Sequence, residues 1–355
     1  MQLDNQRIAI LLHQGIRGDG NGKTGLALLR YSEAPVVAVI DRDCAGESLR
    51  ALTGIPRDVP IVASVADALN YTPNVLAIGI APSGGILPPA WLQEIESALV
   101  AGLSIVNGLH TPLATIPELR SHLRTGQSIW DVRQEPPNLP IASAKARLLA
   151  CRRVLTVGTD MAVGKMSASL ELNAAAKKRG LRSKFLATGQ AGIMITSGDG
   201  IALDAVRVDF AAGAVEQLVM RYGADYDVLF IEGQGSLLHP GSTATLPLMR
   251  GTQPTHLILV HRAGQTHVRN HPHVPIPPLS EVVKLYETVA AAAGAFTPVK
   301  VVAIALNTAH LDEDTAKSAI AQVQQQTQLA CTDVVRFGCN ELLNAIVAQK
   351  IPNSE

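Results

Sequence analysis

Residues 152–172 read RRVLTVGTDMAVGKMSASLEL, which is an apolar run, a glycine-containing loop and a helical pattern in succession. Glycines let backbone N–H groups turn toward an anion, the start of the following helix carries partial positive charge, and Lys165 adds a full charge. The order therefore predicts a phosphate-binding loop. Its candidate contacts are Gly158, Thr159, Asp160, Gly164, Lys165, Met166 and Ser167.

This loop departs from the usual G-x-x-x-x-G-K-[ST] spacing in two ways. Five residues separate Gly158 from Gly164, and Met166 stands where a Ser or Thr would hold Mg²⁺. Ser167 follows one residue later and is the alternative hydroxyl. A strand-to-helix turn with a surface lysine is the plainer interpretation, but the combined pattern favours phosphate binding. ATP hydrolysis is less expected.

The elements on either side of the loop indicate an α/β fold. Short Val/Ile-rich runs at residues 7–12, 36–40, 75–80 and 104–106 alternate with helix-length segments, which predicts a Rossmann-like domain. A second series at residues 153–157, 183–187, 228–231, 256–260 and 299–306 predicts a P-loop NTPase-like parallel sheet. Residues 128–140 contain three prolines and suit a linker better than a core element. We place the domains at residues 1–145 and 146–355.

The composition of the chain restricts the kinds of molecule that the protein can bind. The 355 residues include 30 basic and 30 acidic side chains, a balance that argues against nucleic-acid binding. The chain shows no secretory signal and no apolar stretch long enough to span a membrane. Four well-separated cysteines without a C-x-x-C pair fit a reduced compartment. We therefore expect a cytoplasmic protein, a homo-oligomer, that acts on a small molecule and has no membrane partner.

The spelling GTDMAVGK resembles the phosphate loop of dethiobiotin synthetase, and this resemblance implies a P-loop sheet. The segment DVLFIEGQGSLLHPG places Glu232 after a buried strand, where dethiobiotin synthetases have a comparable Glu-Gly segment. Such a carboxylate lies beside the phosphate loop. A role in the site is favoured over that of a strand-end acid.

The whole chain is similar to a two-domain P-loop family, formerly known as a domain of unknown function, that includes D-glutamate N-acetyltransferases. The matching pieces are GKTGLALLRY, VVAVIDRDCAG, IGIAPSGGILPPAW, GLHTPL, GTDMAVGKMS, EGQGSLLHPG and LILVHRAGQTHVRNHPHVPIPPL. The resemblance implies transfer of an acetyl group from acetyl-CoA to the amine of D-glutamate. Because coenzyme A carries phosphates, a P-loop can bind it without cleaving a nucleotide.

Acetyl transfer to an amine needs a base and, for an acidic acceptor, cations. His261 and Arg262 follow the strand THLILV, and we expect Arg262 to bind a substrate carboxylate. Glu232, His261 and His239 are the candidate bases, with Gly233 and Gln234 as candidate substrate contacts. The five histidines in residues 256–273 are also compatible with a metal site. However, no pair of them has the helical H-x-x-x-H spacing with an acidic partner, so we expect no bound metal.

The N-terminal domain offers weaker candidates. The stretch GIRGDGNGKTG at residues 15–25 imitates a Walker loop but has only three residues between Gly18 and Gly22. Lys23 could still contact an anion, and Ser83 lies in a second glycine loop that could face substrate. Asp41 ends a strand where Rossmann domains hold a ribose hydroxyl, although we expect no nicotinamide cofactor there.

Two other functions stay open. One is an ATP/Mg²⁺-dependent ligase or kinase of the dethiobiotin synthetase type, and the other is a nucleotide-binding regulator.

Overall fold

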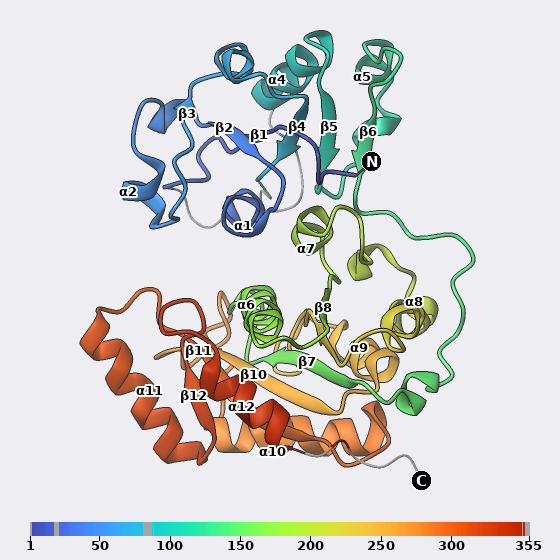
Figure 1. Ribbon diagram of the computed structural model, residues 1–355, viewed down its shortest axis with the longest axis vertical. Coiled ribbons are helices and arrows are strands. Elements are labelled where there is room, and N and C mark those ends of the chain that lie inside the picture. Colours follow the sequence, from blue (N-terminus) through green and yellow to red (C-terminus); the bar gives the residue numbers. More distant parts are fainter. Residues whose placement is uncertain (1, 18–20, 81–86, 88, 350, 352–355) are drawn as a thin grey trace. The chain divides into compact units, whose positions relative to one another are not determined.

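The computed structural model describes residues 2–17, 21–80, 87, 89–349 and 351. It divides into two compact units, and the colours of Figure 1 follow the chain through both of them. Unit 1 comprises Met1–Gln134 and Gln190–Ala205, and unit 2 comprises Glu135–Gly189 and Val206–Glu355. Among the described residues, no helix has the length and apolar character needed to cross a bilayer.

Unit 1 is built on a six-stranded parallel sheet in the order β3-β2-β1-β4-β5-β6. The strands are β1 (Ile8–Leu11), β2 (Val36–Ile40), β3 (Ile61–Val62), β4 (Val75–Ile78), β5 (Ser104–Asn107) and β6 (Ile129–Asp131). This order confirms the predicted Rossmann-like fold.

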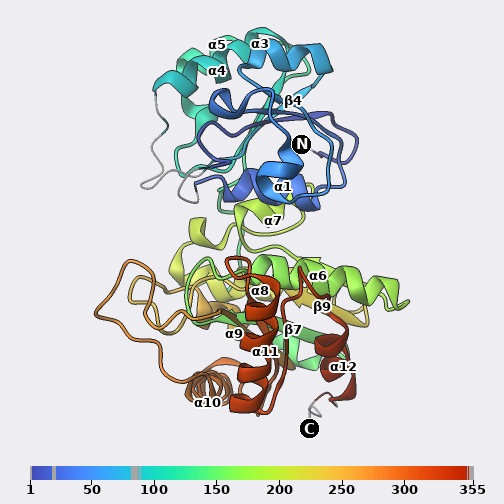
Figure 2. The same cartoon turned by 90° about the vertical axis from the view of Figure 1, so that its left-hand side faces the viewer.

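Two groups of helices cover this sheet. One group contains α1 (Lys23–Tyr31) and α7 (Gln190–Ile195), and the other contains α3 (Val65–Ala68), α4 (Pro89–Val100) and α5 (Pro117–Ser121). Figures 1 and 2 show the groups on opposite faces of the sheet. The short helix α2 (Leu49–Thr53) follows β2.

Unit 2 contains the second parallel sheet, in the order β12-β11-β10-β7-β9-β8. Its strands are β7 (Arg152–Gly158), β8 (Ser183–Leu186), β9 (Val228–Ile231), β10 (His256–Arg262), β11 (Lys300–Asn307) and β12 (Ala330–Thr332). Figure 2 shows α6 (Lys165–Lys178) and α12 (Asn340–Ala348) on one face of this sheet and α10 (Leu279–Val289) on the other face. Helices α8 (Val208–Tyr222), α9 (Thr245–Thr252) and α11 (Glu313–Thr327) complete the unit.

The central strands of unit 2 are apolar because helices cover both of their faces. Every residue of β9 is buried, as are the first six of β10. Side chains of β7, β9, β10 and β11 pack with Leu172 of α6 and Leu342 of α12 in one apolar core. This core fixes the carboxyl end of β7, from which the glycine loop departs.

The described structure differs from the sequence-based division in three respects. Residues 129–131 lie in the segment interpreted as a linker, yet they form the edge strand β6. Unit 1 ends at Gln134 rather than at residue 145. Residues 190–205 follow β8 in the chain but pack within unit 1, where Met194 contacts Gly108 and the Leu3 backbone N–H donates to Ser197.

The linker that enters unit 2 is held against α8 by a buried carboxylate. Glu216 Oε2 accepts hydrogen bonds from the backbone N–H and the hydroxyl of Ser143, at 2.9 and 3.1 Å. Its Oε1 accepts from the backbone N–H of Lys145 at 2.5 Å. Nearby, Gly213 has no room for a Cβ, which would lie 1.8 Å from the carbonyl oxygen of Pro140.

We therefore predict that Glu216→Ala lowers the melting temperature by about 5 to 10 °C, because it leaves buried linker donors without an acceptor. Gln217→Ala, at the neighbouring exposed position of α8, is the control and should melt like wild type. Thermal unfolding followed by circular dichroism measures both. A wild-type melting temperature for Glu216→Ala would contradict the role of this carboxylate.

Candidate active site

The glycine loop connects β7 to α6, as predicted. Ala162 has φ 56° and Gly164 has φ 115°, so the backbone twice enters the left-handed region before α6 begins at Lys165. No side chain caps this helix, and its first turn carries no acidic residue. Because the first N–H groups of a helix have no partner within it, this end presents donors and positive potential suited to an anion.

Lys165 lies buried beneath the loop. Its Nζ donates to the backbone carbonyl of Asp160 at 2.7 Å. Burial lowers the pKa of Lys165 to about 8, and the negative charges of Asp160 and Glu232 oppose that shift. The ammonium therefore stays largely protonated at neutral pH, as a phosphate-binding cation must.

Asp160 connects the loop to the segment that follows β10. Its Oδ1 accepts from the backbone N–H of Met161, while Oδ2 accepts from Gln265 Nε2 and from the backbone N–H of Arg269, each at 2.6 Å. Asp160 thus holds the glycine loop against the segment that follows β10. Gln265 was missed in the sequence, and nothing in the local pattern around it could have revealed a partner 105 residues away.

Glu232 is buried directly after β9. Its Oε2 accepts from the backbone N–H groups of Thr188 and Gly189, at 2.9 and 3.1 Å, and Oε1 lies 3.3 Å from Gln234 Nε2. Burial raises the pKa of Glu232 to about 7, against the lowering effect of those two donors and of Lys165. This carboxyl group can therefore gain or lose a proton near neutral pH.

Gly233 brings Glu232 and Lys165 together. A Cβ at Gly233 would lie 1.7 Å from the carbonyl oxygen of Thr156 and 3.0 Å from Lys165 Cδ. Only glycine allows the chain after β9 to run this close to β7 and to the lysine stem. The Gly233 N–H donates to Thr156 Oγ1 at 2.9 Å.

Tyr286 supports the same region from α10. Its hydroxyl donates to the carbonyl oxygen of Gly158 at 2.6 Å and accepts from the backbone N–H of Leu237 at 3.1 Å. The side chain is fully buried, and burial raises the pKa of its hydroxyl. The tyrosine therefore joins the glycine loop to the segment after β9. Sequence reasoning missed it because a tyrosine on an amphipathic helix reads as ordinary core.

The histidine and arginine candidates occupy different surroundings. His261 is buried, its Nδ1 lies 2.9 Å from Thr159 Oγ1, and burial lowers its pKa to about 4. Arg262 is exposed at the end of β10. His239 Nδ1 accepts from the backbone N–H of Gly241, and its ring lies 4.9 Å from that of His271. Among the described residues, no group of three His, Cys, Asp or Glu side chains is arranged to hold a metal ion.

The described structure gathers part of the predicted set. Lys165, Asp160, Glu232, Gly233 and Gln234 converge around the glycine loop of unit 2. Met166 and Ser167 are half-buried in the first turn of α6. Lys23 begins α1 in unit 1, and Ser83 lies outside the described residues.

The raised pKa of Glu232 makes stability depend on pH. The folded state holds this proton more tightly than the unfolded chain, so its contribution is complete below about pH 4.5 and is lost as pH rises through about 7. We predict that the free energy of unfolding of wild type falls relative to Glu232→Gln over this range, by about 3 kcal/mol at most.

Denaturant unfolding at several pH values measures that difference. Glu281→Gln, at an exposed position of α10, is the control and should follow wild type. A difference between wild type and Glu232→Gln that does not vary between pH 4.5 and 7 would show that burial does not raise this pKa.

Comparison with known proteins gives two kinds of match. A family model described as the P-loop domain of a domain of unknown function, DUF1611, matches residues 140–343, and its Rossmann-like partner matches residues 42–135. A crystal structure of a DUF1611 family protein from Anabaena variabilis has 70% sequence identity and a TM-score of 0.94. The match covers 97% of this chain and all of that one.

Two curated relatives are named D-glutamate N-acetyltransferase. The protein from Tritonibacter scottomollicae is 39% identical over 277 residues, which is 78% of this chain and 81% of the relative. The protein from Pseudoalteromonas sp is 35% identical over 283 residues, which is 79% of this chain and 83% of the relative. Together with the strand orders of both sheets, these matches show that the chain belongs to the DUF1611 family, in which a Rossmann-like domain precedes a P-loop domain.

Proposed function

We propose that this protein is an acetyl-CoA-dependent N-acetyltransferase that acts on the amine of an acidic amino acid, D-glutamate. The names of two relatives that match most of the chain support an enzyme of this class. Within the chain, the observation that carries the proposal is the buried Glu232 carboxyl, with a pKa near 7, beside a cationic phosphate loop.

The phosphate loop suits coenzyme A. The uncapped start of α6 and the buried Lys165 offer donors and charge to its phosphates. Met166 stands where a nucleotide-hydrolysing loop has its metal-binding hydroxyl, and acetyl transfer needs no such metal. Gly158, Thr159, Asp160, Gly164 and Ser167 complete this proposed site.

Glu232 is the base that we assign. The ammonium of the acceptor gives a proton to the Glu232 carboxylate, and the freed amine attacks the thioester carbon. A C–N bond forms, the C–S bond breaks, and the departing thiolate takes the second amine proton. A base works best with a pKa near the working pH, which favours Glu232 at about 7 over His261 at about 4. His239 is the remaining alternative.

The acceptor carboxylates require cations. Arg262 is exposed at the carboxyl end of β10, the edge of the sheet at which parallel α/β domains bind ligands. A guanidinium can hold a carboxylate through two parallel hydrogen bonds. Gly233 and Gln234 are proposed as further contacts, and Lys23 and Ser83 stay predictions.

The protein should form N-acetylated product from acetyl-CoA and D-glutamate with EDTA present and ATP absent, because no step above uses a metal or a nucleotide. Mass spectrometry of the acceptor detects the product. D-Glutamine, which lacks the side-chain carboxylate, is the matched control and should react more slowly. A requirement for hydrolysable ATP and Mg²⁺ would replace this proposal with the ligase or kinase.

Glu232→Gln should lower kcat by roughly 100-fold or more with little change in KM for acetyl-CoA, because it removes the proton acceptor. The wild-type rate should rise with pH and level off above about 7, and this dependence should disappear in the variant. His261→Gln and His239→Gln are the comparison variants. If His239→Gln abolishes turnover while Glu232→Gln keeps it, the base is His239.

A further inference from the structure

Unit 1 has the strand order of dinucleotide-binding Rossmann domains, 3-2-1-4-5-6. Residues 20–25 read GNGKTG, which is the G-x-G-x-x-G spacing of such domains. The expectation of no nicotinamide cofactor assumed that no G-x-G-x-x-G precedes Asp41, and that assumption was wrong. Gly20 lies outside the described residues, so the structural argument rests on Gly22, Gly25 and Asp41.

The two described glycines lie at the start of α1 and allow close contacts there, and a Cβ at Gly22 would lie 2.2 Å from the Gly15 carbonyl oxygen. Gly22 is the N-cap of α1, which has no side-chain cap and no acidic residue in its first turn. Gly25 packs this helix against the end of β4: its N–H donates to the Gly79 carbonyl at 2.7 Å, and a Cβ would lie 3.1 Å from Gly79 Cα. Close packing of helix on sheet is the function of the last glycine in the pattern.

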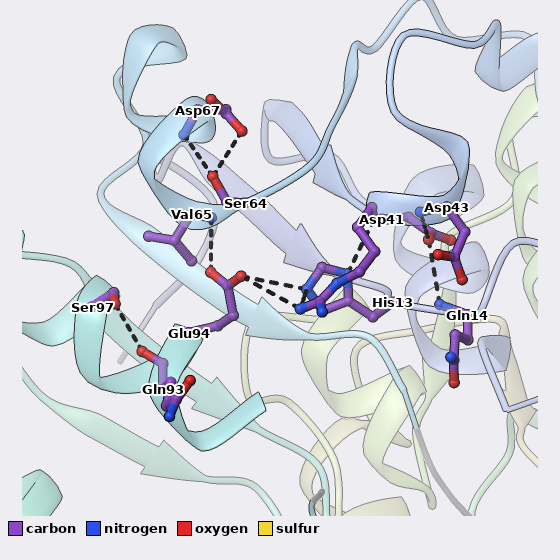
Figure 3. Close-up of polar contacts among 11 residues, drawn as sticks. His13, Gln14, Asp41, Asp43, Ser64, Val65, Asp67, Gln93, Glu94 and Ser97 are labelled. Atoms are coloured by element: carbon purple, nitrogen blue, oxygen red, sulfur yellow. Dashed lines mark hydrogen bonds and ion pairs between the residues drawn. The ribbon is translucent and has the colours of Figure 1, made fainter. Parts of the chain in front are cut away.

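Asp41 supplies an independent sign of a ligand. It directly follows β2 and is fully buried. Its Oδ1 accepts from the backbone N–H groups of Asp43 and Gln14, at 3.2 and 3.4 Å (Figure 3). Its Oδ2 has no hydrogen-bond partner among the described residues. A buried carboxylate oxygen without a donor is unfavourable, so Oδ2 has unused capacity to accept a hydrogen bond from a ligand hydroxyl.

The position of Asp41 indicates which donor. Asp41 lies 21 residues beyond Gly20, close to the spacing of about 20 residues at which Rossmann domains place the acid that binds a ribose hydroxyl. The Gln14 N–H that bonds Oδ1 belongs to the chain between β1 and α1, so the Asp41 carboxylate lies beside the beginning of that connection.

Arg42 is a nearby cation, and its side chain is half-exposed beside Glu94 and His13. Its Nη2 lies 3.9 Å from Glu94 Oε1 and 3.5 Å from His13 Nε2. Glu94 is itself fixed by the Val65 N–H at 2.9 Å. The buried Asp41 carboxylate carries a negative charge at the end of β2, which disfavours a phosphate on the ribose.

We propose that unit 1 binds a nucleotide of the NAD class, through a ribose whose 2′ and 3′ hydroxyls are both unphosphorylated. A ribose hydroxyl donates to Asp41 Oδ2, and the diphosphate lies at the start of α1. The residues of this site belong to unit 1, whereas the glycine loop that begins at Gly158 belongs to unit 2. Because the adenosine ribose of coenzyme A carries a 3′-phosphate, acetyl-CoA does not fit it.

Calorimetry on the full chain tests the proposal with NAD, NADP and coenzyme A as probes. NAD should bind, and NADP should bind about tenfold more weakly or worse. Asp41→Asn keeps the oxygen that accepts from Gln14 and Asp43 but replaces Oδ2 with an NH₂ group. It should weaken NAD binding by about tenfold or more.

Two control variants separate the possible causes. Asp43→Asn removes the same charge from an exposed position two residues away and should leave NAD affinity unchanged. Lys165→Ala, in the glycine loop of unit 2, should weaken coenzyme A and leave NAD unchanged.

Absence of NAD binding at millimolar concentration would overturn the proposal, as would equal affinity for NAD and NADP. An Asp41→Asn protein that melts like wild type and binds NAD normally would also overturn it. If Asp41→Asn does not fold, the preference of wild type for NAD over NADP decides alone. Loss of NAD affinity in Lys165→Ala would place the nucleotide on unit 2 and contradict a second site.

Discussion

Burial of two groups of opposite charge, Lys165 and Glu232, is the constraint around which the candidate site is arranged. Burial shifts both pKa values toward neutrality, and each charge favours the ionised form of the other. Neither group relies on the other for its hydrogen bonds, because Lys165 donates to a backbone carbonyl and Glu232 accepts from two backbone N–H groups. The backbone thus fixes both side chains and leaves their charges available for chemistry.

The sequence allowed us to predict those features of the site that depend on residues close together in the chain. The loop from Gly158 to Lys165 was predicted because its glycines, its lysine and the following helix are consecutive. Glu232 was predicted for the same reason, since it directly follows an apolar strand. The burial of His261 was not foreseen, because strand THLILV shows only that its end lies near the sheet edge, and neighbouring elements decide its exposure.

Contacts between distant segments were beyond such patterns. Tyr286 bonds Gly158 across 128 residues, and Asp160 bonds the Arg269 N–H across 109. Strand β6 was mistaken for linker because three residues at a sheet edge carry too short an alternation to recognise. The affiliation of residues 190–205 with unit 1 depends on packing alone, since nothing in their composition distinguishes them from a connection within unit 2.

That affiliation has a topological reason. Right-handed crossovers place the helices that follow β4 and β5 on one face of the unit 1 sheet, together with α3. On the other face, α1 covers the first strands, and the described helices between β4 and β6, α4 and α5, lie on the opposite face. Helix α7 supplies the missing cover from later in the chain, with Met194 against Gly108 just after β5.

Synthesis on the ribosome is where this arrangement has a consequence. All six strands of the first sheet have been translated by Asp131, but the segment that completes its covering ends only at Ala205. At bacterial or eukaryotic elongation rates of about 5 to 20 residues per second, several seconds pass between the two. During that interval the nascent sheet lacks the cover of α7, and its exposed apolar surface is of the kind that chaperones protect from aggregation.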